Sequence, residues 1–105
     1  MAYAAYRYAS APVGMTAVSF VVVDVVAAVA EAAHVRHAAS ACDGAGVVRC
    51  IPLQHDGRVR LQIRCPACEV GHLMQEVMHH ATEAEFGRMT PWADHLATYR
   101  QCRHD

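Results

Sequence analysis

The sequence predicts one small α+β domain with, in chain order, an N-terminal helix, a β-hairpin with a zinc-ribbon-like CxxC turn, and two C-terminal helices. Three observations predict this class: an alanine-rich apolar segment before residue 42, two apolar runs flanking an Asp-Gly dipeptide, and helically spaced apolar residues after the CxxC pair. The 105 residues suffice for one domain, which we place at residues 17–105. We interpret residues 1–16 as a flexible N-terminal arm or a non-native extension.

The first predicted helix begins after Ser19, which can cap it, and extends to about residue 39. Alanine is the strongest helix former, and its density favours a helix in the second half of this segment. Residues 20–23 also fit a short strand, in which case Asp24 caps a later helix. Gly44 and Gly46 predict a turn after the helix.

The hairpin comprises residues 47–53 and 58–64, because Asp-Gly is typical of a tight hairpin turn. One register sorts the hairpin into an apolar side and a polar side. It pairs Val48 with Ile63, Cys50 with Leu61 and Pro52 with Val59 on the apolar side, where we expect Cys50 to be a core residue. The polar side carries four arginines, Arg49, Arg58, Arg60 and Arg64.

A second helix is predicted over residues 69–86, with Gly87 ending it. Thr90-Pro91 then resembles a helix cap followed by proline at the first helical position, and so begins the last helix. On the second helix, His72, Glu76, His79 and Glu83 share one face, which we interpret as solvated.

Composition excludes several classes of protein. Hydrophobic residues make up 54% of the chain and charged residues 18%, too apolar for a disordered protein. The net charge of −1 gives no global attraction to nucleic acid or to anionic membranes. The apolar run at residues 17–30 contains Asp24 and is too short for a membrane span. An odd number of cysteines with a close CxxC pair is typical of a reducing compartment, so we expect a cytoplasmic protein.

The CxxC pair, Cys65 and Cys68, has the spacing of half a structural zinc site. The hairpin register places Cys42 opposite residue 69, near this pair, and makes it the third predicted ligand. For the fourth ligand we favour His37, with His72 as the alternative. The predicted cofactor is therefore structural zinc.

No catalytic set accompanies these cysteines, so we favour a non-enzymatic, zinc-stabilised binding module that acts through protein contacts in regulation or assembly. A protein partner or a homodimer is expected, because residues 20–33 are rich in apolar side chains. One alternative is nucleic-acid binding through the hairpin arginines. Another is a thiol-disulfide oxidoreductase, because the order strand, Cys-Pro-Ala-Cys, helix resembles the redox site of thioredoxin-like enzymes over about ten residues.

Overall fold

The structure, a computed structural model, describes residues 19–53 and 57–104, so the predicted arm at residues 1–16 lies outside the described residues. Strands and helices are interspersed along the described chain, with β4 and β5 in direct succession. In order they are β3 (Phe20–Ala28), the 3-10 turn η1 (Val29–Glu31), α1 (Ala32–Ser40), β4 (Gly46–Leu53), β5 (Arg58–Pro66), the 3-10 turn η2 (Ala67–Glu69), α2 (Val70–His80), β6 (Glu85–Pro91) and α3 (Trp92–His104).

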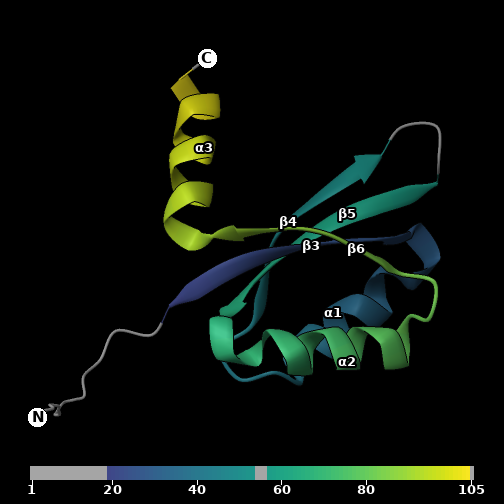
Figure 1. The fold of residues 1–105 in the computed structure, drawn as a ribbon. Coiled ribbons are helices and arrows are strands. Elements are labelled where there is room, and N and C mark those ends of the chain that lie inside the picture. Colours follow the sequence, from purple (N-terminus) through teal and green to yellow (C-terminus); the bar gives the residue numbers. More distant parts are fainter. Residues whose placement is uncertain (1–18, 54–56, 105) are drawn as a thin grey trace, which may run out of the picture.

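The four strands form one antiparallel sheet in the order β4-β5-β3-β6. The chain therefore follows the β-α-β-β-α-β path of the ferredoxin-like, or split βαβ, arrangement, with α3 added at the end. Helices α1 and α2 cover one face of the sheet, and α3 stands on its other side (Figure 1). The predicted α+β class is confirmed.

The predicted N-terminal helix is wrong in its first half, because the described chain begins with strand β3. Valine dominates this segment, and β-branched side chains fit a pleated strand better than a helix. β3 is a central strand, paired with β5 on one side and β6 on the other, and it buries side chains on both faces. That position explains its near-continuous apolar sequence. The alternative of a strand followed by a later helix is right in its order of elements, but the strand extends to Ala28, so Asp24 lies within it and does not cap the helix.

The predicted hairpin is present, and its register is confirmed from Arg49 to Leu53. At its base a β-bulge shifts the pairing, so Val47 rather than Val48 lies opposite Ile63. The prediction that Cys50 is a core residue is wrong. Cys50 pairs with the buried Leu61, but β4 is an edge strand and Cys50 is exposed.

The predicted second helix ends early, at His80, because the next residue leaves the helical region at φ −142° and ψ 80°. The chain then forms β6, a strand that the sequence pattern did not predict. Its glycine and its single β-branched residue, Thr90, give it low strand propensity. Pairing along the free edge of β3 supplies the order that its own sequence lacks.

The core lies between the sheet and the two covering helices. It includes Leu61 and Ile63 from the sheet, Val35 from α1, and Leu73 and Val77 from α2, all with no exposed surface. Burial of such side chains contributes about 1.5–3 kcal/mol each and is the main driving force of the fold. No helix among the described residues is long and apolar enough to cross a membrane.

The opposite sheet face, which we call the outer face, receives the start of α3. The Arg64 guanidinium lies 4.0 Å from the centre of the Phe20 ring and 5.0 Å from that of Trp92. Both contacts are cation–π interactions, which hold the first turn of α3 against β3 and β5. Arg64 therefore fastens the added helix to the sheet.

Candidate metal site

Cys42 is positioned by the turn that follows α1. Its amide donates a hydrogen bond to the Ala39 carbonyl, and its own carbonyl accepts one from the Ala45 amide, both at 3.1 Å. Gly44 has a φ of +77°, and a Cβ there would lie 3.0 Å from Cγ of Pro66. Glycine is therefore required twice over, by its backbone conformation and by the close approach of Pro66. This contact places the Cys42 turn directly against the CxxC segment.

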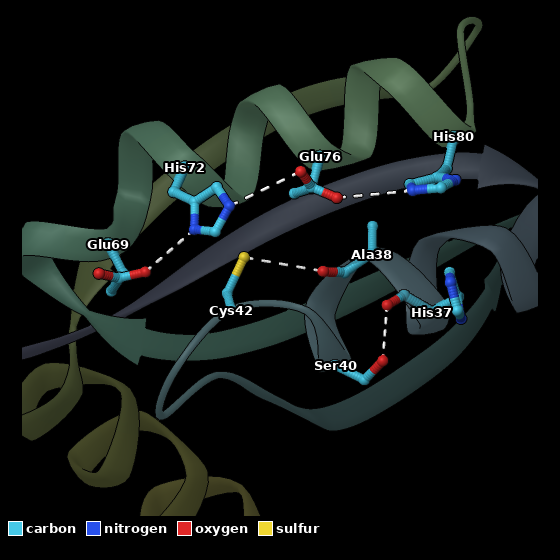
Figure 2. A network of polar contacts seen from close by, with 8 residues as sticks. All are labelled: His37, Ala38, Ser40, Cys42, Glu69, His72, Glu76 and His80. Carbon is cyan, nitrogen blue, oxygen red and sulfur yellow. Dashed lines mark hydrogen bonds and ion pairs between the residues drawn. The ribbon is translucent and has the colours of Figure 1, made fainter.

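Two further donors come from the start of α2. One ligand atom each from Cys42, Glu69 and His72 lies within 4.8 Å of the other two. In Figure 2 the Cys42 sulfur lies beside the His72 ring, with the Glu69 carboxylate next to that ring. A tetrahedral zinc ion needs its donors about 3.3–3.6 Å apart, so small side-chain movements suffice to enclose an ion. This set, which we call the Cys42 group, is the one such group among the described residues.

The structure unites some of the predicted ligands and separates others. Cys42 and the alternative fourth ligand His72 belong to the Cys42 group, whereas the preferred His37 does not. The His37 ring instead packs edge-on against His80, with ring centres 5.2 Å apart. The turn after α1 meets the start of α2, whereas His37 on α1 meets the end of α2. His37 therefore lies away from Glu69 and His72.

The CxxC thiols lie beside the Cys42 group without being members of it. Cys65 is buried on the core side of β5, and Cys68 is exposed in η2. Both are close enough for charge to matter, because charge on Cys42, Glu69 and Cys68 adds to the main effect of burial in raising the pKa of the Cys65 thiol. A metal at the Cys42 group would therefore have two more thiols nearby.

Electrostatics keep the Cys42 thiol protonated in the metal-free chain. Burial raises its pKa, and the negative charges of Glu69, Glu76 and Asp43 raise it further. The protonated sulfur donates a long hydrogen bond, 3.7 Å, to the Ala38 carbonyl. A bound divalent cation would reverse this balance, because it favours the thiolate and is attracted by the same carboxylates.

These pKa shifts also bear on the redox alternative. A reactive cysteine of the thioredoxin type is partly exposed and has a lowered pKa. Cys65 has no exposed surface, and its pKa is raised. The environment of Cys65 therefore differs from that of a thioredoxin-type nucleophile.

A row of imidazole and carboxylate groups extends from the Cys42 group along α2. The Nδ1 atom of His72 lies 3.2 Å from Oε1 of Glu69, and its Nε2 atom lies 3.6 Å from Oε2 of Glu76. Glu76 also contacts His80, with Oε1 3.5 Å from Nε2 (Figure 2). If Nδ1 of His72 binds a metal, its Nε2–H faces Glu76. This is the carboxylate–histidine–metal arrangement that orients many metal ligands.

Glu69 is the member of the Cys42 group that sequence reasoning missed. The signal was available in the spacing Glu69-x-x-His72, which puts both side chains on one face of a helical turn.

The four hairpin arginines lie on the polar side of the hairpin, where acidic or aromatic groups contact Arg58, Arg60 and Arg64. Arg58 lies 3.6 Å from Glu85, and Arg60 lies 3.9 Å from Asp24. Arg64 is stacked between two rings, as described above. The fourth, Arg49, borders a hollow of about 240 Å³ beside Trp92 and Leu96.

Comparison with known proteins supplies no family. No protein-family model matches the sequence, and no curated protein matches it significantly.

Proposed function

We propose that the protein is a zinc-binding module in which Cys42, Glu69 and His72 hold the ion. The single observation that carries the proposal is the convergence of a thiol, a carboxylate and an imidazole within 4.8 Å, from segments 27 or more residues apart in the chain. Sulfur, nitrogen and oxygen donors together suit Zn²⁺, which accepts all three in tetrahedral sites.

The proposed role of the ion is structural. It would link the turn after α1 to the first turn of α2, two segments otherwise joined through the Gly44–Pro66 contact and the helix interface. Structural zinc sites normally have four protein ligands, so the proposal includes a CxxC thiol, Cys65 or Cys68, at the fourth position. Small domains commonly gain stability from such an ion.

The module would act through a protein partner or a second copy of itself. Large apolar side chains on its surface support this part of the proposal: Val29, Val48, Met78 and Met89 are between 41% and 58% exposed. Aromatic and methionine side chains are common in protein interfaces. Light scattering after size exclusion, with and without zinc, tests self-association; a monomer at all concentrations would leave a different protein as the partner.

Elemental analysis of protein purified without a metal-affinity tag tests the metal proposal. We expect about one zinc per chain in the wild type and its loss in Cys42→Ser. Cys50→Ser is the matched control, because Cys50 is exposed on the edge strand and lies outside the Cys42 group. Single serine variants of Cys65 and Cys68 identify the fourth ligand. A folded wild type that binds no zinc contradicts the proposal. So does equal zinc loss in Cys42→Ser and Cys50→Ser.

A further inference from the structure

The outer face of the sheet contains a hollow that the metal site does not use. Its volume is about 480 Å³, and strands β3, β5 and β6 and helix α3 contribute to its lining. Its lining includes the polar side chains of Asp24, Arg60, Gln62, Arg88, Thr90 and His95. The volume is in the range of small-molecule sites, about 300–1,000 Å³.

The charge of the hollow favours an anion. Two arginines, Arg60 and Arg88, and one carboxylate, Asp24, line the hollow, which leaves a net charge of +1 among these three groups. Arg60 lies 3.9 Å from Asp24, so that pair is largely neutral. Arg88 forms no ion pair with a carboxylate in the described part of the chain. Its guanidinium is therefore available to a phosphate or carboxylate group of a ligand.

The hollow also offers a hydrogen-bond acceptor. The Gln62 amide donates to Oδ1 of Asp24 at 3.3 Å, which fixes the orientation of the amide group. The Gln62 carbonyl oxygen, Oε1, has no hydrogen-bond partner among the described residues, but its surface is covered by protein. The Asp24 carboxylate lines the hollow and keeps part of its surface exposed, so a ligand with a hydroxyl or amino group can donate a hydrogen bond to it.

We propose that this hollow binds a small phosphate ester that also carries hydroxyl or amino groups, a molecule of the size of a mononucleotide or sugar phosphate. The phosphate lies at Arg88, with Arg60 nearby, and the donor groups lie toward Asp24. The hydroxyl of Thr90 supplies a further polar contact. The site is on the sheet face opposite α1 and α2, so it does not depend on the zinc proposal.

Calorimetric titration of the intact protein at low salt tests this site, with adenosine monophosphate as the probe. We expect saturable one-to-one binding, weaker binding of ethyl phosphate, which lacks the donors, and none of adenosine, which lacks the anion. Arg88→Ala should weaken the binding of adenosine monophosphate about 10- to 100-fold. Arg36→Ala, the same charge change on the exposed face of α1, should leave it unchanged.

Three results would overturn the proposal. The first is the absence of saturable binding by adenosine monophosphate. The second is an equal loss in the two arginine variants, which would indicate a nonspecific charge effect. The third is tight binding of single-stranded oligothymidylate that strengthens with length while the mononucleotide does not bind, which would indicate a nucleic-acid track. Cys42→Ser should retain the affinity for adenosine monophosphate, which separates this site from the metal site.

Discussion

Replacing His72 by alanine should weaken zinc binding and leave the stability of the metal-free fold nearly unchanged. The His72 side chain is 47% exposed, and its two carboxylate contacts lie at the surface and are ion pairs only when the ring is charged. Such pairs contribute less than about 1 kcal/mol, so the metal-free variant should unfold at nearly the wild-type urea midpoint.

Zinc affinity should respond very differently. His72 supplies the nitrogen donor of the Cys42 group, and the loss of a residue that only supports a ligand already costs 10- to 100-fold in affinity. We therefore expect His72→Ala to weaken zinc binding by at least about 100-fold, which corresponds to about 2.7 kcal/mol or more. Competition with a chromophoric chelator measures the affinity, and urea unfolding in EDTA measures the stability.

His79→Ala is the matched control. His79 is on the same helix, is exposed, and packs edge-on against His80 outside the Cys42 group. Its zinc affinity should equal that of the wild type. Equal affinities in the His72 and His79 variants would refute the assignment of His72 as a ligand.

Three further predictions concern the fold and its pH dependence. Leu73→Ala, at a site with no exposed surface, should lower the free energy of unfolding in urea by about 2–5 kcal/mol. Met78→Ala, 52% exposed on the same helix, should lower it by less than about 0.5 kcal/mol. Similar losses in the two variants would contradict the placement of Leu73 in the core. Arg64→Ala removes both ring contacts, so we expect a loss of about 1–3 kcal/mol and a change in the fluorescence of the single tryptophan; unchanged emission would argue against the stacking. In EDTA, the raised pKa of Cys65 means that the folded state holds this proton more tightly than the unfolded state. The stabilisation that this proton provides is present below about pH 8.5 and is lost as pH rises through the folded pKa. Cys65→Ala should therefore reduce the slope of the unfolding free energy against pH, and identical slopes at alkaline pH would contradict the shift.

Local signals in the sequence were sufficient for the hairpin. The Asp-Gly turn and the alternation of Arg58 to Arg64 with buried apolar residues defined two strands and most of their register. The bulge at Val48 was not predictable from this pattern, because it depends on how the edge strand meets the sheet.

Two elements depended on tertiary context. β3 was predicted as a helix because alanine follows its valines, but pairing on both sides and burial of both faces favour the strand. β6 has weak propensity and is ordered by the free edge of β3. Local propensity does not register either effect.

The position of Cys42 could be predicted in outline, whereas the zinc ligands stay a prediction. The hairpin register placed Cys42 near the CxxC turn, and the close approach of Gly44 to Pro66 brings the two segments together, because strand geometry determines where the ends of a hairpin lie. The choice between His37 and His72 required the packing of α1 against α2, which the sequence does not specify. Glu69 could not be singled out in advance, because glutamate at the start of a helix is common without any metal.

X-ray absorption at the zinc edge, on the zinc-loaded protein, tests the central claim most directly. The proposed site predicts a mixed shell, with sulfur at about 2.3 Å and nitrogen or oxygen at about 2.0–2.2 Å, and loss of the Cys42 sulfur contribution in Cys42→Ser. A shell of nitrogen and oxygen alone, or one that Cys42→Ser leaves unchanged, would place the ion elsewhere and contradict the claim.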